Sequence, residues 1–254
     1  MNRTALLLAA VVAGSSPAMA FDVETYAEQL TRHTRAVEDT AGTRIDYAGL
    51  RSDPDWRRVV ASLETSNPSP LEGARALAFW INAYNVLALD WIVREGPVES
   101  IRDLGNLWRP VWKKSAGRVG GHEVTLDEIE HRILRPMGEP RIHFAIVCAS
   151  TSCPSLRREP FRATELHRQL DEQTREFLAD ARKGMAIARA PENVRLSKIF
   201  DWFAEDFGKA QGVVAFVTEH APEADRAWLL EYADRMDLVY LPYDWRVNAL
   251  PSRP

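Results

Sequence analysis

The segment RIHFAIVCASTSCP, residues 141–154, contains both cysteines of the chain and one of its six histidines. A cysteine acts as a nucleophile when a histidine within hydrogen-bond reach helps to form its thiolate. Two cysteines five positions apart can instead be bridged across a turn, above all in an oxidising compartment. The segment therefore predicts one of three states: a reactive thiol, a Cys148–Cys153 disulfide, or two unlinked buried thiols.

The apolar run from Ile142 to Cys148 predicts a buried strand that leads into a polar turn. Neighbouring side chains on a strand alternate between its faces, so His143 and Cys148 would point to opposite sides. Cys153 follows the turn and can approach either face. If the chain has a thiol nucleophile, we therefore expect Cys153 in that role, with His143 as the first choice of base and His131 as the second.

The longest apolar element runs from Leu71 to about Arg94 and predicts a helix at the centre of the core. Asn82 and Asn85 lie three positions apart on it and therefore share a helical face. Because buried amides need hydrogen-bond partners, these side chains either pin a neighbouring loop or orient a catalytic group or ligand. In the catalytic interpretation Asn82 steadies an oxyanion or orients the base, and Asn85 contributes to binding.

Other parts of the chain carry clear local signals for helices and turns. Asp53 before Pro54 predicts the start of a helix that ends near Leu63, and Gly120-Gly121 predicts a hairpin. Thr125 to Glu128 fits a capping box for a short helix that ends at Leu134. Further elements are expected at these positions: helices at 22–37, 165–182, 201–207, 211–220 and 222–236, and strands at 194–199 and 238–241.

Glu128 and His131 are three apart on the short helix, a spacing that some metal-binding bundles use. Two candidate ligands do not make a metal site, and a solvated or hydrogen-bonded helix face explains them more simply. The sequence predicts no metal and no cofactor. Aromatic residues near the C-terminus, namely Trp202, Phe203, Phe207 and Trp245, are expected to be core anchors, because aromatic side chains dominate burial.

The first twenty residues have the pattern of a secretory signal peptide. Arg3 provides a basic start, an apolar stretch follows, and Ala18-Met19-Ala20 is a typical cleavage pattern. We therefore expect a periplasmic or secreted protein without stable membrane insertion after cleavage. The formal net charge of −4 makes nucleic acid an improbable partner, and the expected partner is a small molecule or a peptide.

The pattern of elements predicts an α+β fold in a single domain, with a central buried helix and a small, mostly antiparallel sheet. A cysteine-peptidase-like arrangement is one form that such a fold can take. We divide the chain into a signal peptide, 1–20, an N-terminal helical region, 21–70, a core domain, 71–248, and a tail, 249–254.

Five motifs in this order resemble the family called domain of unknown function 547. They are FWINAYN at 79–85, LDEIEHRILR at 126–135, PRIHFAIVCASTSCP at 140–154, DWFAEDF at 201–207 and YDWRVN at 243–248. The resemblance singles out eight side chains: Asn82, Asn85, His131, Arg141, His143, Cys148, Ser152 and Cys153. Of these, Arg141, Cys148, Ser152 and Asn85 are assigned to binding.

Three departures of the chain from the family pattern Asn-Cys-Gly-Ala-Arg-Ser-Cys-Pro bear on its chemistry. Val147 stands in place of the Asn, Ala149 in place of the Gly, and Thr151 in place of the Arg. The change at Ala149 removes easy access to positive φ, and the other two remove possible ligand contacts.

Three hypotheses about function follow. The first is an exported thiol-dependent hydrolase or acyl transferase that uses Cys153. The second is a non-catalytic module that binds a ligand or a protein and is stapled by a Cys148–Cys153 disulfide. The third is a metal site formed by Glu128, His131 and a cysteine.

Overall fold

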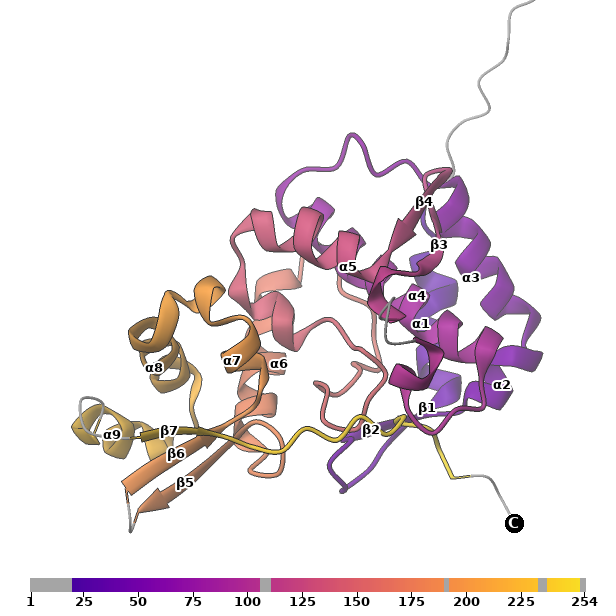
Figure 1. Ribbon diagram of the computed structural model, residues 1–254. Helices are drawn as coiled ribbons and strands as arrows, with labels where there is room; N and C mark the ends of the chain where they lie inside the picture. The colour runs from indigo at the N-terminus through magenta and orange to yellow at the C-terminus, as the bar shows by residue number, and fades with distance from the viewer. Residues whose placement is uncertain (1–19, 106–110, 190–191, 233–236, 252–254) are drawn as a thin grey trace, which may run out of the picture.

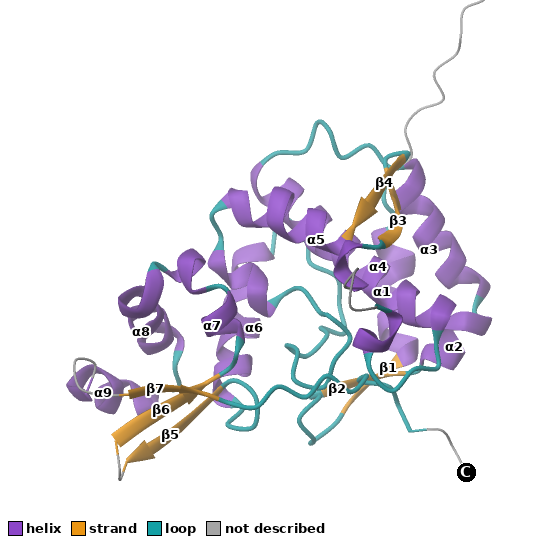
Figure 2. Ribbon diagram, viewed as in Figure 1, coloured by secondary structure: helices purple, strands orange, loops and turns teal. Residues whose placement is uncertain are grey.

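A computed structural model describes residues 20–105, 111–189, 192–232 and 237–251. The expected signal peptide lies outside the described residues, apart from Ala20. The fold is α+β, as the sequence predicts, with many helices and several small sheets (Figure 2). The sheets pair mostly antiparallel: β1 with β2, β3 with β4 and β5 with β6, whereas β6 and β7 are parallel.

The N-terminal elements pack around the central helix, on the right in Figure 1. Their bounds are α1 Val23–His33, β1 Thr34–Ala36, β2 Thr43–Ile45, α2 Tyr47–Ser52 and α3 Pro54–Thr65. The aspartates at 22, 46 and 53 each accept a hydrogen bond from a backbone N–H in the first turn of the following helix. Capping by Asp53 confirms the helix start that Pro54 indicated.

Helix α4, Gly73–Glu95, is the expected central helix. It is the one helix among the described residues that is long and apolar enough to cross a membrane, yet 89% of its most apolar window is buried inside the protein. Asp90 on α4 accepts a hydrogen bond from Trp56 Nε1 on α3 at 3.0 Å and pairs with Arg94 at 2.8 Å. The carboxylate therefore satisfies the indole N–H where the two helices pack.

The hairpin around Gly120-Gly121 is present, formed by β3 Ser115–Val119 and β4 His122–Thr125. Thr125 then caps α5 Leu126–Glu128, which continues as the π-helical segment η3 Ile129–Leu134 and the 3-10 turn η4 Arg135–Met137. The expected helix thus exists, but its second half is widened, a feature that is common at functional sites.

The predicted strand from Ile142 to Cys148 is wrong. Residues Pro140–Phe144 form the 3-10 helix η5, with Glu139 as its cap, and 145–149 are irregular. A short apolar run does not distinguish a strand from a buried helical segment. The amide of Asn85 takes the place of a neighbouring strand, because it donates to the Ala145 carbonyl and accepts from the Val147 N–H.

The C-terminal half forms a second apolar cluster, centred on Phe144, Phe200 and Phe207. Its elements are α6 Leu166–Ala179, β5 Met185–Arg189, β6 Glu192–Leu196, α7 Ile199–Trp202, η6 Ala204–Phe207, α8 Lys209–His220, α9 Glu223–Tyr232 and β7 Asp237–Tyr240. After β7 an extended segment, residues 241–251, returns across the molecule to β2 (yellow in Figure 1). On its way it pairs at Val247 with Ser150 and at Ala249 with Ile45.

Candidate functional site

A cavity of about 600 Å³ collects most of the reactive side chains described below. It lies between the α5–η3 segment, the loop that carries the cysteines, helix α7 and the returning segment 241–251. Its lining residues are Tyr84, Arg102, Trp112, Asp127, Glu130, His131, His143, Ile146, Cys148, Cys153, Pro154, Ile199, Trp202, Phe203, Tyr243 and Trp245. Four predicted site residues therefore meet here: His131, His143, Cys148 and Cys153.

His143 is held by contacts on both ring nitrogens and on one ring face. Its Nε2 lies 2.7 Å from Asp206 Oδ2, its Nδ1 lies 3.8 Å from Glu130 Oε1, and its ring stacks on Phe203 at 4.1 Å. The side chain is 1% exposed. Burial lowers the pKa of His143 to about 4 in spite of the opposing hydrogen bond to Asp206, so the ring is neutral at neutral pH.

A chain of hydrogen bonds continues from His143 to the protein surface. Asp206 accepts two hydrogen bonds from Arg135, at 2.6 and 2.7 Å, and Arg135 also lies 2.8 Å from His131 Nδ1. Burial would raise the pKa of Asp206, but the hydrogen bonds from Arg135 and His143 outweigh it and the pKa is lowered. Asp206 is therefore the fixed anion that orients both the guanidinium and the buried imidazole.

Glu130 on η3 carries the most unusual carboxyl of the cavity. Its side chain is 14% exposed and hydrogen-bonds to the buried Tyr84 hydroxyl. Burial raises the pKa of Glu130 to about 7, against the attraction of Arg135. Glu130 can therefore gain or lose a proton near neutral pH, whereas the neighbouring His143 stays neutral. When protonated, Glu130 can donate a hydrogen bond to a ligand, and when ionised it can accept one.

The two sulfurs in the cavity wall are joined as the Cys148–Cys153 disulfide. The Tyr243 hydroxyl lies 3.4 Å from both sulfurs, and the Cys148 N–H donates to Cys153 Sγ at 2.9 Å. Cys153 therefore has no free thiolate here. The expected pairing of Cys153 with His143 is also corrected, because both nitrogens of that ring face carboxylates rather than sulfur.

The loop that carries the disulfide is held by the returning C-terminal segment. Thr151 N–H donates to the Arg246 carbonyl at 2.8 Å, and Ser152 exchanges hydrogen bonds with Asp244 through its N–H, at 3.1 Å, and its hydroxyl, at 2.9 Å. Ala149 in this loop adopts a φ of +59°, a region that favours glycine. The glycine of the family pattern thus has a structural explanation, and this chain keeps the backbone turn without it.

Aromatic side chains form another part of the cavity lining. Trp202 stacks on Trp245 with 5.5 Å between the ring centroids, and the ring centroid of Tyr243 lies 4.5 Å from that of Trp245. Arg102 sits over the Trp245 ring, 5.4 Å from its centroid. Trp202 is 45% exposed, so the interpretation of this residue as a core anchor is wrong, whereas Phe207 is buried as expected.

Four predicted site residues do not line this cavity. Asn82 donates to the Phe161 carbonyl and accepts from the Phe161 N–H, and Asn85 binds 145–147, so both amides pin loops to α4. Arg141 pairs with Glu139 and Asp171, and Ser152 binds Asp244. The loop-pinning alternative for the two asparagines therefore describes their contacts.

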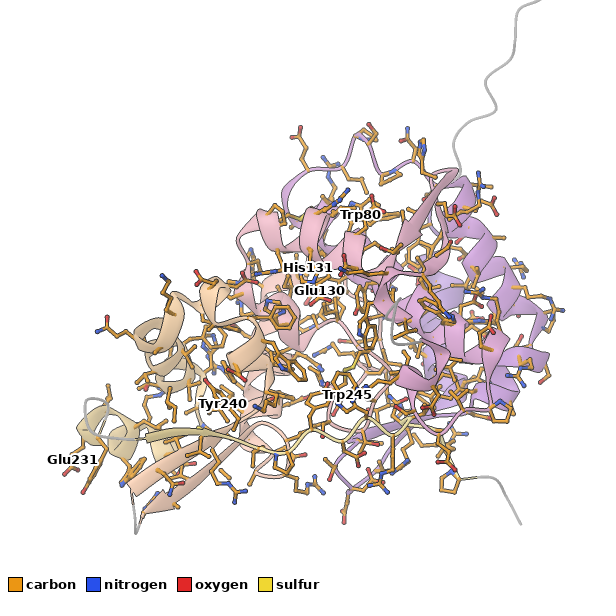
Figure 3. All side chains as sticks on the ribbon, viewed as in Figure 1. Trp80, Glu130, His131, Glu231, Tyr240 and Trp245 are labelled. Atoms are coloured by element: carbon orange, nitrogen blue, oxygen red, sulfur yellow. A yellow bond between two sulfur atoms is a disulfide. The ribbon has the colours of Figure 1, made fainter. Side chains whose placement is uncertain are left out.

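Several residues of the site were not anticipated from the sequence, above all Glu130, Asp206, Arg135, Tyr84 and Tyr243. Glu130 and Arg135 lie in the same motif as His131, and Asp206 and Tyr243 lie in two further motifs. Their place in these motifs is the sequence feature that could have identified them. Figure 3 shows Glu130 and His131 side by side on η3, with Trp245 on the returning segment. Within the residues that the structure describes, no group of three or more His, Cys, Asp or Glu side chains could hold a metal ion.

Comparison with known proteins gave no match among curated proteins or solved structures. A family model described as "Protein of unknown function, DUF547" matches residues 68–178. This range contains α4, Glu130, His143 and both cysteines, whereas Asp206 and the Trp202–Tyr243–Trp245 wall lie beyond it. Residues 68–178 of this chain therefore match the DUF547 family.

Proposed function

We propose that this protein is an exported ligand-binding module whose cavity takes a small molecule with a flat apolar face and a polar edge. The apolar face would stack on Trp202 and Trp245, and the polar edge would reach Glu130, which lines the same cavity. The aromatic wall carries this proposal, because Trp202 remains 45% exposed at the rim of a 600 Å³ cavity. Binding sites commonly combine such apolar walls with a few polar groups.

The state of the cysteines favours binding over thiol-dependent hydrolysis or acyl transfer. A thiol nucleophile needs a free sulfur and a base that faces it. Here the sulfurs are paired, and both nitrogens of His143 are directed at Asp206 and Glu130. The bridge is therefore assigned to the wall of the binding site.

Two features support export to the periplasm or beyond. Ala18-Met19-Ala20 follows an apolar stretch, and the disulfide suits an oxidising compartment. Export predicts that the mature protein recovered from the periplasm or the medium begins at Phe21. N-terminal sequencing that finds Met1 retained on the protein would remove this part of the proposal.

Binding can be tested with 8-anilinonaphthalene-1-sulfonate, a probe that has a flat naphthalene ring system and whose emission can be excited through nearby tryptophans. We expect one saturable site in the native protein. Trp202→Ala removes one stacking surface and should raise the Kd about fivefold, equivalent to about 1 kcal/mol. The matched control is Leu230→Ala, which removes an exposed apolar side chain on α9.

The control variant should bind the probe like the native protein. Equal affinity of the native protein and the Trp202→Ala variant would contradict the proposed site, provided that both proteins unfold at similar urea concentrations.

A further inference from the structure

The two cysteines occupy different positions in the cavity wall. Both line the cavity, but Cys148 is half-buried whereas Cys153 is 4% exposed. A thiol that enters the cavity would therefore meet Cys148 Sγ more readily than Cys153 Sγ. This asymmetry assigns the two sulfurs different roles in any exchange reaction.

The loop is fastened by contacts that do not involve the disulfide. Residues 149–152 exchange backbone hydrogen bonds with Asp244, Arg246 and Asn248 of the returning segment. The bridge itself closes a loop of only five positions, which restricts the unfolded chain less than a long loop would. We therefore expect the fold to survive the loss of this bond.

The surroundings of Cys153 favour its thiolate. Its Sγ accepts the fixed backbone N–H of Cys148 at 2.9 Å, and the Tyr243 hydroxyl lies 3.4 Å away. The buried ammonium of Lys183 donates to the Cys153 carbonyl at 3.0 Å, so a positive charge lies beside the backbone of this cysteine. Cys148 Sγ, by contrast, lies near two hydroxyls, of Ser150 at 3.1 Å and of Tyr243 at 3.4 Å. A sulfur whose thiolate is stabilised is the better leaving group.

We propose that Cys148–Cys153 is a redox-active disulfide that exchanges with thiols entering the cavity, with Cys148 as the attacked sulfur and Cys153 as the leaving group. The incoming thiolate forms a bond to Cys148 Sγ while the Cys148–Cys153 bond breaks, and its electron pair goes to Cys153 Sγ. A second thiol then attacks the sulfur of the first, releases Cys148, and leaves as a disulfide with the first. Two thiols are oxidised, the protein gains two electrons, and the two thiol protons end on the two cysteines.

This inference goes beyond ligand binding and needs no particular resident ligand. The substrate class is a small thiol or a cysteine in a flexible peptide, which can enter a cavity of this volume. Failure of the binding experiment with 8-anilinonaphthalene-1-sulfonate would therefore leave this proposal intact, and failure of this proposal would leave ligand binding intact.

Single-cysteine variants test the assigned roles, with oxidised glutathione as the probe and intact mass spectrometry as the readout. Cys153→Ser leaves Cys148 free at the cavity and should form a one-to-one mixed disulfide. Cys148→Ser leaves the buried Cys153 and should react at least about tenfold more slowly. Equal rates for the two variants would overturn the assignment of Cys148 as the attacked sulfur.

The native protein provides a second test that does not depend on how the cysteine variants fold. Reduced glutathione should reduce the disulfide while the circular dichroism spectrum stays native, with the free thiols counted after alkylation. Tyr243→Phe removes a donor near the leaving sulfur and should slow reduction about threefold, whereas Tyr240→Phe on β7 should not. Reduction that occurs only after unfolding would refute a redox-active bridge.

Discussion

The molecule uses buried polar groups in two different ways, one around α4 and one around the cavity. On α4, the amides of Asn82 and Asn85 form hydrogen bonds with backbone groups of two loops. At the cavity, Glu130, His143 and Asp206 are bound to other side chains, and one side of the group faces the cavity. A buried polar side chain whose hydrogen bonds go to the backbone therefore maintains the fold, whereas a titratable cluster at a cavity wall is available to a ligand.

The largest effect should come from removing one of the two buried amides on α4. Asn85→Ala leaves the Ala145 carbonyl and the Val147 N–H buried without their amide partner, which should lower the free energy of unfolding by about 3 kcal/mol. Urea unfolding monitored by circular dichroism measures this change. Trp202→Ala at the exposed rim is the contrasting variant and should cost less than about 1 kcal/mol. A loss below 1 kcal/mol in Asn85→Ala would show that the loop does not depend on this amide.

The second prediction concerns how the stability of the protein depends on pH through two residues of the cavity, His143 and Glu130. Between pH 4 and 6.5 unfolded His143 binds a proton that the folded protein rejects, so this residue makes stability rise with pH. Between pH 4.5 and 7 folded Glu130 keeps a proton that the unfolded chain releases, so this residue makes stability fall with pH. The two effects on the pH dependence of stability nearly cancel in the native protein. Between pH 4.5 and 6.5 the pair Glu130 and His143 holds one proton in the folded state, on Glu130, and one in the unfolded state, on His143.

Removing one member of the pair should expose the slope of the other. Glu130→Gln should become more stable from pH 4 to 6.5, by up to about 3 kcal/mol. His143→Gln should become less stable from pH 4.5 to 7 by a similar amount. Urea unfolding across this pH range provides the comparison, and two variants with the same pH profile would contradict the assigned protonation states.

The sequence predicted those elements that depend on neighbouring residues and missed those that depend on contacts between distant parts of the chain. Asp53 before Pro54, Thr125 and the glycines at 120–121 act on their own neighbours, and the caps and the hairpin were correctly predicted. The strand at Ile142–Cys148 was not, because its backbone partner is a side chain on α4, 60 or more residues away in sequence. Glu130 and Asp206 resemble surface acids in the sequence, since only the folded chain buries them against His143 and Tyr84.

The smallest effect should come from the backbone of the disulfide loop. Ala149 has φ +59°, so Ala149→Gly should relieve a conformation that costs an L-residue about 1–2 kcal/mol, against an entropic loss of about 0.5–1 kcal/mol. The net expectation is a gain of about 0.5–1 kcal/mol in unfolding free energy. The matched control is Ala145→Gly at φ −104°, which should be destabilised instead. A loss of stability in both variants would show that the loop gains nothing from glycine at position 149.

Hydrogen–deuterium exchange with and without 8-anilinonaphthalene-1-sulfonate shows directly whether a ligand binds at the cavity lined by aromatic and titratable side chains. A second hollow, lined by Phe21, Phe79 and Asn82, provides an internal comparison. We expect slower exchange confined to residues 127–135, 146–154, 199–203 and 243–247, with no change at 20–23 or 66–79. Protection at the second hollow, or at neither place under saturating probe, would contradict it.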